Sequence, residues 1–393
     1  MSTEQELKKN NPLHKEFQNL LDKDFEDSGA KIIKDRSEGL SVSDIVCRIN
    51  KPPEDEIHIL KDGGIHISFL DPFNEKNLVD AFVSSRTTAI SMELVPRITR
   101  AQKMDALSSQ ANLGGYAAVI EASKHLTKSF PMMMTAAGSI SPSKVFVIGF
   151  GVAGLQAIAT AKRLGARVEA FDTRPIVEEQ VRSLGAKFIK IDIGETGETD
   201  QGYAKELTSE QIQLQQQGMK KVCSQSDVVI TTAQVFGRPA PRIVTAEMVS
   251  AMQPGTVIVD MAVSTGGNVE GSVSGEVVNL NGVTIVGLLN LPGEMATDAS
   301  LVYGNNLFNL IEEYWDKEKK EFNFDIEEVA IHKDFSMGKC KLATASFGHG
   351  ISTTLLQLAK GYSVISNGGY TVNPKLIFKD SEKLQNEKKM ILN

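Results

Sequence analysis

Three glycines with a fixed spacing and one aspartate form the part of the sequence best suited to chemistry. Gly149, Gly151 and Gly154 stand in the run GFGVAG, and Asp172 follows at about the distance, roughly 20 residues, at which a dinucleotide-binding unit carries its acidic residue. The first glycine allows the tight turn, the second lets the backbone approach a pyrophosphate, and the third lets the helix pack close to the strand. The spacing therefore predicts a dinucleotide site at this turn.

Asp172 indicates which dinucleotide is preferred. A carboxylate at this position accepts hydrogen bonds from the hydroxyls of the adenosine ribose and repels a 2′-phosphate, which favours NAD over NADP. The alternative is a turn with a purely structural role, because glycines also mark ordinary turns. The neighbouring segments favour the dinucleotide interpretation, since an apolar run precedes the glycines, a helical pattern follows them, and a second apolar run ends in Asp172.

A second group of polar residues stands just before a long helical pattern. It consists of Arg97, Arg100, Gln102 and Asp105. From spacing alone, the simplest interpretation is a solvated helix start with Asp105 in its first turn, where a negative charge stabilises the helix.

These residues require a sheet to position them. Apolar runs alternate with helical patterns from about residue 24 onwards, which predicts an α/β fold with two Rossmann-like domains. The second domain is expected to be a doubly wound parallel sheet that binds the dinucleotide at the carboxyl ends of its strands, and a long helix within residues 95–130 links the two domains. The strand-like runs are AKIIK, DIVCRI, GIHISFL and TTAISMEL in the first domain, and KVFVIG, RVEAF, AKFIKI, DVVITTA, TVIVDMAV and VTIVGL in the second.

Composition excludes several classes of protein. The 393 residues are 41% hydrophobic and carry a net charge of −7 without a basic block, which argues against nucleic acid as a partner. The N-terminal segment is polar and no apolar segment is long enough to span a bilayer, so we expect a cytoplasmic protein. Cys47, Cys223 and Cys340 lie far apart, which indicates reduced, mostly buried thiols, and no metal site is expected.

Two further features are interpreted without assigning chemistry. Residues 193–218 are the most polar and glycine-rich stretch and include Tyr203 as their aromatic residue, so they are expected to form a functional or mobile loop followed by a polar helix. His58 and His66 are expected at the surface or at a sheet edge, and neither is given a role.

The chain is similar, over about residues 24–328, to the NAD(H)-binding component of proton-translocating NAD(P) transhydrogenases, within the alanine dehydrogenase/transhydrogenase family. The resemblance implies a two-domain homodimer that exchanges hydride with NADP(H) bound on a partner component, while a membrane component couples the reaction to proton translocation. Such a chain is cytoplasmic and peripheral to the inner membrane through its partner subunits. The segments that carry the resemblance are SMELVPRITRAQKMDALSSQANLGGY, MMMTAAGSISPSKVFVIGFGVAGLQAIATAKRLGA, QGYAKE, ITTAQVFGRPAPRIVT, MQPGTVIVDMAV and LVYGNNLFNLI.

The resemblance also implies roles for individual residues. Arg97, Gln102 and Asp105 match the catalytic loop that positions the nicotinamide of NAD(H), and no general base is needed because hydride passes directly between two cofactors. The other implied contacts are Gly149, Gly151, Val152 and Gly154 at the pyrophosphate turn; Asp172, Thr173 and Arg174 beside the adenosine; Gly202 and Tyr203 in a closing loop; Gln215 on its helical limb; and Gln234, where the family more often has an apolar residue.

Alanine dehydrogenase is the nearest alternative, because it is similar in fold and cofactor. That enzyme type has a catalytic histidine after the strand that corresponds to HISFL and an aspartate in the segment that corresponds to VDMAVSTGG. This chain has Asp71 and Ser264 at the matching positions. Oxidation of an amino acid would lack its proton acceptor, which ranks this alternative below transhydrogenase.

Both ends of the chain depart from the resemblance. Residues 1–23 are unrelated to the family, so the first domain, residues 24–110 and 296–328, would lack its opening strand and helix, whereas residues 111–295 form the NAD-binding domain. Residues 329–393 are interpreted as an appendage, in which 331–379 resemble a fragment of a class B penicillin-binding protein transpeptidase without the S-x-x-K and K-T-G motifs. A chimera explains both ends, and an inactive chimeric NAD-binding module is therefore a further alternative.

If residues 331–393 are an appendage, removing them should leave NADH binding intact. We expect the truncated chain to bind NADH within about threefold of the full chain, and limited proteolysis to cut first between Lys333 and Lys341, because loosely tied segments are where proteases act. Fluorescence titration with NADH measures the first outcome, and mass spectrometry of the fragments measures the second. Loss of folding on truncation would show instead that this segment packs on the α/β core.

Overall fold

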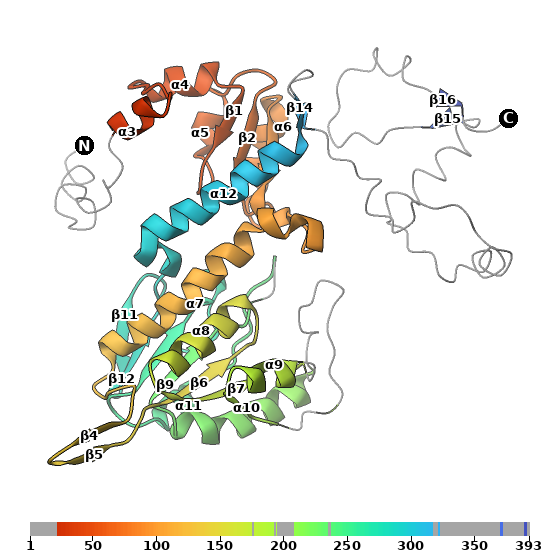
Figure 1. Ribbon diagram of the computed structural model, residues 1–393. Coiled ribbons are helices and arrows are strands. Elements are labelled where there is room, and N and C mark those ends of the chain that lie inside the picture. Colours follow the sequence, from red (N-terminus) through yellow and green to blue (C-terminus); the bar gives the residue numbers. More distant parts are fainter. Residues whose placement is uncertain are drawn as a thin grey trace, which may run out of the picture. The chain divides into compact units, whose positions relative to one another are not determined.

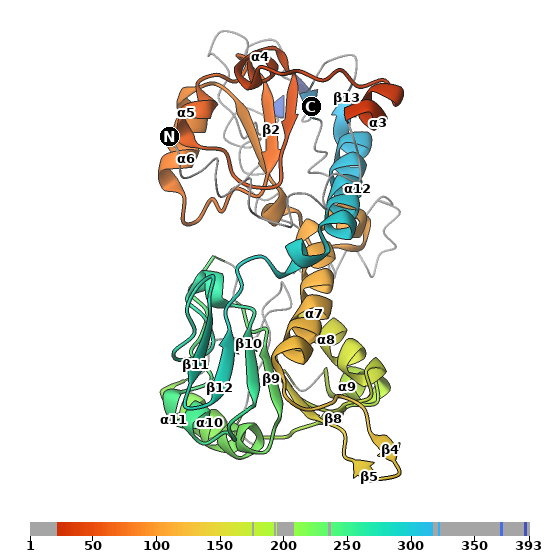
Figure 2. The ribbon, with the colours of Figure 1, turned by 90° about the vertical axis from the view of Figure 1, so that its left-hand side faces the viewer.

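A mostly parallel sheet is built from strands within residues 144–286 (Figures 1 and 2). The computed structural model describes residues 22–174, 177–191, 194, 208–234, 237–316, 321–322, 370–371 and 389–390. Within these residues the sheet has seven strands in the order β11-β12-β10-β9-β6-β7-β8, and only the edge strand β11 pairs antiparallel. The strands are β6 Lys144–Ile148, β7 Arg167–Phe171, β8 Lys187–Phe188, β9 Val228–Thr231, β10 Val257–Asp260, β11 Val277–Leu280 and β12 Val283–Val286.

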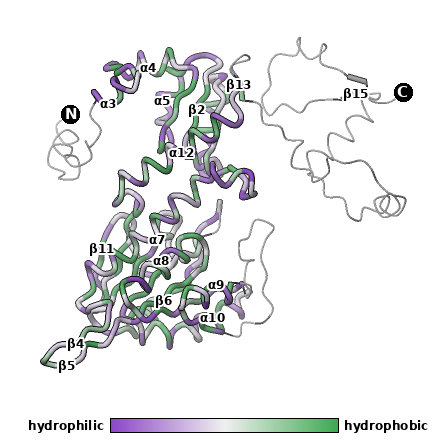
Figure 3. Tube along the Cα trace, viewed as in Figure 1, coloured by the Kyte–Doolittle hydropathy of each residue, from purple (hydrophilic) through white to green (hydrophobic). Residues whose placement is uncertain are grey.

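Helices cover both faces of this sheet, as the alternation of side chains along β6 shows. Val145 and Val147 point into one core layer, which includes residues of α7 (Ala106–His125), α8 (Val152–Arg163) and α9 (Glu178–Ser183). Phe146 and Ile148 point into the opposite layer, which includes residues of α10 (Ser209–Ser224) and α11 (Ala246–Ser250). With both faces buried, the strands are predominantly hydrophobic (Figure 3), as expected of parallel sheets.

The strand order confirms the predicted fold class and shows where the direction of winding reverses. The chain runs outward from β6 through β7 to β8, then returns to β9 on the other side of β6. Between β6 and β9 the direction of winding reverses, and ligands of open α/β sheets bind beyond the carboxyl ends of the strands at such a point. The antiparallel edge strand β11, which the sequence did not predict, pairs with β12 in a hairpin closed by Asn281, whose φ is 55°.

A smaller parallel sheet lies earlier in the chain, in the order β1 (Ile45–Cys47), β2 (Ile65–Ser68), β3 (Thr88–Ser91). Its helices are α3 Asp22–Asp27, α4 Arg36–Val42, α5 Glu54–Ile57 and α6 Lys76–Ser84, with a 3₁₀ turn η1 at Met92–Leu94. The prediction of a strand at AKIIK, residues 30–34, was wrong: this segment pairs with no described strand, and Ile33 is exposed. Its short apolar run lacks the neighbouring strand that would satisfy its backbone.

A β-hairpin that the sequence did not predict precedes β6. Its strands are β4 (Met133–Thr135) and β5 (Gly138–Ile140), and it extends away from the rest of the domain in Figures 1 and 2. The side chains of Met132, Met133 and Met134 are exposed. Apolar side chains on an isolated two-stranded hairpin leave a surface without a partner within this chain's described residues.

The chain divides into two compact units, Met1–Asn309 and Leu310–Asn393. Helix α12, Ala296–Tyr314, runs across this boundary, and the second unit has the short pairs β13 (Trp315–Asp316) with β14 (Glu321–Phe322) and β15 (Tyr370–Thr371) with β16 (Lys389–Met390). Residues 323–369 lie outside the described residues, so the predicted cleavage region does too. None of the described helices is both long and apolar enough to cross a membrane.

The two described cysteines differ in their surroundings. Cys223 is fully buried, and burial raises the pKa of its thiol to about 12, whereas Cys47 is exposed. The prediction of reduced thiols holds for both, since both are free, whereas the prediction of burial holds for Cys223 and is wrong for Cys47. Cys340 lies outside the described residues.

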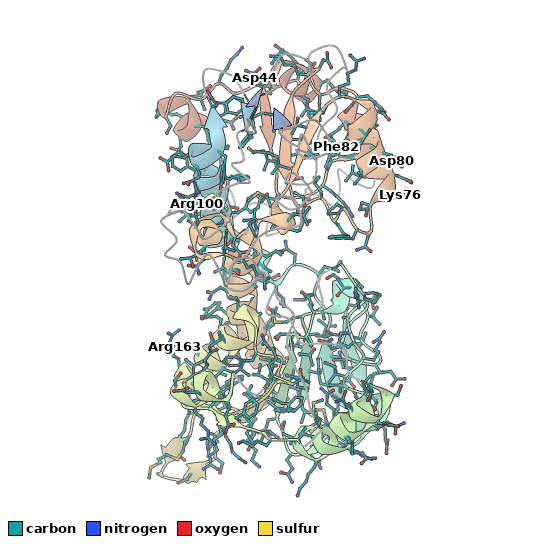
Figure 4. All side chains as sticks on the ribbon, turned by 90° about the vertical axis from the view of Figure 1, so that its right-hand side faces the viewer. Asp44, Lys76, Asp80, Phe82, Arg100 and Arg163 are labelled. Carbon is teal, nitrogen blue, oxygen red and sulfur yellow. The ribbon has the colours of Figure 1, made fainter. Side chains whose placement is uncertain are left out.

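His66 is fully buried in β2, the central strand of the smaller sheet, so the prediction of a surface or edge histidine was wrong for this residue. Its Nε2 lies 3.0 Å from Ser68 Oγ, its Nδ1 has no hydrogen-bond partner, and its ring lies 5.3 Å from that of Phe82. Figure 4 shows Phe82 between α6 and the sheet, with Lys76 and Asp80 on the outer side of α6. Burial, together with the charge of Arg48, lowers the pKa of His66 to about 4.

We expect His66 to make folding stability depend on pH. The unfolded chain binds the proton near pH 6.5 and the folded chain near pH 4, so stability from this residue is complete above pH 6.5 and is lost as pH falls through this window. The loss approaches about 1.4 kcal/mol per pH unit. Denaturant unfolding at pH 7, 6, 5 and 4.5 should give a shallower pH dependence for His66→Gln, whereas His58→Gln, at an exposed position, should follow wild type. Equal slopes for all three proteins would contradict the buried neutral histidine.

Candidate functional site

The glycines between β6 and α8 meet three different steric demands. A Cβ atom on Gly149, whose φ is +97°, would lie 2.7 Å from Thr232 Oγ1, and one on Gly154 would lie 2.1 Å from the carbonyl oxygen of Gly149. A Cβ atom on Gly151 would meet nothing within 4 Å. Gly149 and Gly154 are therefore needed for the fold of the turn itself, whereas Gly151 leaves open space at the N-terminus of α8.

That N-terminus is suited to an anion. Gly151 is the N-cap of α8, and it offers no side chain to accept a hydrogen bond from the first helical turn. The N-terminal N–H groups of a helix of twelve residues point outward and carry the positive end of its dipole. Open space beside these donors fits a pyrophosphate group, for which glycine turns of this kind provide the site in dinucleotide-binding folds.

Asp172 lies directly after β7 and is bonded to the same turn. Its Oδ2 accepts the backbone N–H of Phe150 at 2.7 Å, and its Oδ1 accepts the backbone N–H of Arg174 at 2.8 Å. The guanidinium of Arg174 adds a bidentate pair, with Nε 2.9 Å from Oδ1 and Nη2 3.0 Å from Oδ2. Nη2 also donates to the carbonyl oxygen of Phe150 at 2.9 Å. The structure thus brings Asp172 and Arg174 together with the glycine turn.

A buried polar network lies at the ends of β9 and β10, next to the point where the strand order reverses. The side chain of Asn268 accepts from the N–H of Ala233 at 3.1 Å and donates to its carbonyl oxygen at 2.8 Å. Asp260, fully buried, accepts the N–H groups of Asn268 and Val269 at 3.1 and 3.2 Å. Asn268 was missed by the sequence analysis, and the only signal for it was its place after the glycine pair that follows β10.

The second polar group begins helix α7. Asp105 is its N-cap: Oδ1 accepts the N–H of Ser108 at 2.9 Å and Oδ2 the hydroxyl of Ser108 at 2.5 Å. Arg97 Nε lies 4.0 Å from Asp105 Oδ2, with its side chain 40% exposed against 9% for Asp105. Gln102 is exposed in the 3₁₀ turn η2, Thr99–Met104. The prediction of a solvated helix start with Asp105 in its first turn was wrong in its details: Asp105 is the buried N-cap, one position before the first turn of α7, and one of its oxygens also faces Arg97.

Helix α7 connects these two groups of residues. It begins at Asp105 and packs on α8 so closely that a Cβ atom on Gly115 would lie 2.2 Å from the carbonyl oxygen of Ala153. Ala153 belongs to the first turn of α8, next to the glycine turn. Direct contact with α7 therefore fixes the position of the N-terminus of α8.

The other predicted site residues lie at several places. Val152 and Thr173 are half-buried at the turn and after β7, and Gln215 is buried on α10. Gln234 is exposed, and its side-chain nitrogen donates to the carbonyl oxygen of Met261 at 3.3 Å. Gly202 and Tyr203 lie outside the described residues.

Two positions were expected to distinguish this chain from alanine dehydrogenase: Asp71 stands at the position of the expected histidine, and Ser264 at the position of the expected aspartate. Asp71, with φ of 52°, follows β2 and donates its backbone N–H to Glu93. Ser264 is exposed in the 3₁₀ turn η4, Val263–Thr265.

Comparison with known proteins agrees with this geometry. Residues 15–114 match the N-terminal domain, and residues 118–343 the C-terminal domain, of the alanine dehydrogenase/PNT family. The first part of the NAD(P) transhydrogenase alpha subunit of Rickettsia prowazekii is 44% identical over 325 residues, which cover 81% of this chain and 84% of the relative. The chain belongs to the alanine dehydrogenase/PNT family. The subunit of the same name from Rhodospirillum rubrum is 44% identical over 311 residues, 77% of this chain and 81% of the relative.

Solved structures place the fold in the same alanine dehydrogenase/PNT family. The crystal structure of transhydrogenase from Sinorhizobium meliloti is similar with a TM-score of 0.67 and 43% identity, covering 75% of this chain and 81% of that one. An L-alanine dehydrogenase structure with a TM-score of 0.62 and 21% identity has the same fold. Alanine dehydrogenase of Mycolicibacterium smegmatis is 28% identical over 256 residues, 64% of this chain and 63% of the relative. The predicted family and fold class are therefore confirmed.

Residues 305–392 also match the transpeptidase domain of penicillin-binding proteins. This match overlaps the one to the alanine dehydrogenase/PNT domain, and most of it lies outside the described residues. No activity is inferred from the transpeptidase match.

Two glycine variants should separate binding from folding. Gly151→Ala places a methyl group in open space, so we expect it to cost less than about 1 kcal/mol of stability, the range of an unfavourable N-cap. The same methyl group would exclude a pyrophosphate and weaken NADH binding by tenfold or more. Gly154→Ala should instead destabilise the protein by several kcal/mol because its Cβ meets backbone. Thermal unfolding measures the change in stability, and titration with NADH measures the change in affinity. Unchanged NADH affinity in folded Gly151→Ala would show that the turn does not contact the dinucleotide.

Proposed function

We propose that this chain is the NAD(H)-binding component of a proton-translocating NAD(P) transhydrogenase. In this proposal hydride passes directly between NAD(H) on this chain and NADP(H) on a partner component, and a membrane component couples the exchange to proton translocation. The observation that carries the proposal is the glycine turn, open at Gly151 and bonded to Asp172, at the point where the strand order reverses. It is supported by 44% identity to relatives named as transhydrogenase alpha subunits.

In this proposal, different residues of the turn bind different parts of the dinucleotide. The N-terminus of α8 holds the pyrophosphate at the open side of Gly151. Asp172, at the end of β7, takes the hydroxyls of the adenosine ribose. Thr173, Arg174, Val152 and Gln234 complete the proposed contacts, together with Gly202, Tyr203 and Gln215 from the closing loop and its helix. The bound nicotinamide supplies the hydride chemistry.

The proposed work of Arg97, Gln102 and Asp105 is positioning. Arg97 lies beside the carboxylate of Asp105, whose side chain is 9% exposed and accepts two hydrogen bonds from Ser108. Because these hydrogen bonds hold the carboxylate in place, it can orient the guanidinium of Arg97. Exposed Gln102 offers an amide donor and acceptor to a carboxamide. Rates of direct transfer depend steeply on geometry, because a displacement of about 1 Å costs about a hundredfold.

A homodimer is part of the proposal. The hairpin β4–β5 and the residue before it expose three consecutive methionines, which are adaptable apolar contacts. A second copy of the chain is the occupant that we assign to this surface. Association with the inner membrane is proposed to run through partner subunits.

Alanine dehydrogenase activity and an inactive NAD-binding module are the alternatives that remain. The first is supported by alanine dehydrogenases at 26% and 28% identity, but Asp71 and Ser264 stand where that chemistry needs other residues. The second would bind NADH and transfer nothing.

Reconstitution distinguishes these three functions. The purified chain alone should neither transfer hydride between dinucleotides nor produce NADH from alanine, and adding the NADP-binding component of a relative should start transfer. Arg97→Ala and Asp105→Asn should slow transfer about tenfold or more while changing the NADH dissociation constant less than threefold. Asn is also a good N-cap, so the second variant keeps α7. Absorbance of the two nicotinamides follows the reaction.

Lys103→Ala is the matched control, because Lys103 is an exposed side chain in the same 3₁₀ turn. It should transfer hydride at the wild-type rate. NADH formation from alanine would support the dehydrogenase alternative, and binding without transfer in the presence of the partner would support the inactive module.

A further inference from the structure

Asn306 is a buried asparagine of α12 whose side chain uses both ends of its amide. Its Nδ2 donates to the carbonyl oxygen of Lys103 at 2.9 Å, and its Oδ1 accepts the hydroxyl of Ser109 at 2.7 Å. A backbone carbonyl can only accept, so the amide nitrogen must face Lys103. Because the residue is 6% exposed, water competes little for either hydrogen bond. Asn306 therefore joins α12 to two points at the beginning of α7.

The carbonyl that Asn306 holds lies inside the segment proposed to position the nicotinamide. Lys103 is the last residue but one of the 3₁₀ turn η2 and stands between Gln102 and Asp105. The last carbonyl groups of a helical turn have no partner within it, so they need donors from elsewhere. Asn309, three residues further along α12, is a second donor to the same carbonyl oxygen at 3.2 Å. The backbone between Gln102 and Asp105 is thus attached to α12 as well as to α7.

Helix α12 has its own attachment to the smaller sheet. Tyr303 is buried, its hydroxyl donates to the carbonyl oxygen of Arg48 at 2.6 Å, and its ring lies 5.4 Å from that of Phe69. Arg48 directly follows β1, and Phe69 directly follows β2. Tyr303 and Asn306 are three residues apart, so they lie on one face of α12. The smaller sheet therefore sets the position of Asn306 independently of the segment that Asn306 holds.

Hydride transfer is more sensitive than NADH binding to this attachment. In the proposed site, the turn at Gly151 and the carboxylate of Asp172 hold the dinucleotide, so affinity depends little on the exact position of Gln102. The rate depends steeply on geometry, since a displacement of about 1 Å costs about a hundredfold. Releasing the carbonyl of Lys103 would allow such a displacement of the backbone between Gln102 and Asp105.

We propose that Asn306 is a positioning residue for hydride transfer, which holds the carbonyl of Lys103 and thereby places Gln102 and Asp105 against the nicotinamide. This inference rests on the proposed function and deepens it. Asn306 itself touches neither dinucleotide, because it acts through the backbone of η2. In this proposal α12, which contributes no contact to the dinucleotide, determines the geometry at its nicotinamide end.

The test uses the chain reconstituted with the NADP-binding component of a relative. In a single turnover hydride passes from NADH to NADP⁺, which leaves NAD⁺ and NADPH, and the rate is measured at saturating NADH. Asn306→Leu keeps the approximate volume of the side chain but has no donor for the carbonyl of Lys103. We expect transfer to slow about tenfold or more, while the NADH dissociation constant, measured by fluorescence, changes less than threefold. Deuterium at the transferred position of NADH should slow the variant at least as much as wild type, because transfer itself is then the slow step.

Two variants are matched controls. Asn305→Leu makes the same substitution at an exposed position of α12. Gln110→Ala removes another hydrogen bond between α7 and α12, from the side-chain nitrogen to the carbonyl oxygen of Ala299 at 3.1 Å, and leaves the donors to Lys103 in place. Both should transfer hydride within about twofold of the wild-type rate. If thermal unfolding shows that Asn306→Leu does not fold, Asn306→Ala takes its place and the same outcomes apply.

Several results would overturn the inference. A wild-type rate in a folded Asn306 variant would do so, as would equal slowing in Gln110→Ala, which would show that any contact between α7 and α12 has this effect. A loss of NADH affinity as large as the loss of rate would assign Asn306 to binding instead of geometry. An isotope effect that disappears in the variant would show that a step other than transfer had become slow.

The wild-type rate separates this inference from the proposed function. Wild type that transfers hydride at the same rate as the Asn306 variant leaves the proposed function standing and contradicts the role of Asn306. Wild type that transfers nothing in the presence of the partner component contradicts the proposed function, and the role of Asn306 in transfer with it.

Discussion

The close approach of helix α8 to strand β6 is the constraint on which the rest of the site depends. The carbonyl oxygen of Gly149 occupies the space that any side chain at Gly154 would need, so the turn can close only with glycine there. Closing the turn directs the N-terminus of α8 towards the carboxyl end of the sheet and brings the N–H of Phe150 to Asp172. Helix, turn and the acid at the end of β7 are thus one unit, formed by local packing before any ligand is considered.

Sequence reasoning succeeded where a residue type is dictated by local backbone geometry. The glycine spacing, the buried strands β6, β9 and β10, and Asp105 at the start of α7 all follow from period, turn chemistry or capping within a few residues. The strand order then follows from the way βα units wind, because consecutive units add to one side until the chain reverses.

It failed where the outcome depends on partners that are distant in sequence. Residues 30–34 have the composition of a strand but find no neighbour among the described strands, and His66 is buried because β2 became the central strand of its sheet. Asn268 holds Ala233 across a separation of 35 residues. The Asp172–Arg174 pair shows a subtler limit: both residues were identified, but their mutual hydrogen bonding is visible only in three dimensions.

Helix α7 sets the distance between two parts of the proposed site. Asp105 caps its first turn beside Arg97, and Gly115, ten residues later, touches the first turn of α8. At about 1.5 Å per residue, these two points are held about 15 Å apart. Any change in the length or register of α7 between them would move the nicotinamide side of the proposed site relative to the pyrophosphate side without altering a single contact residue. A one-residue insertion in this stretch would therefore rotate Arg97 and Asp105 by about 100° around the helix axis while leaving the turn at Gly151 intact.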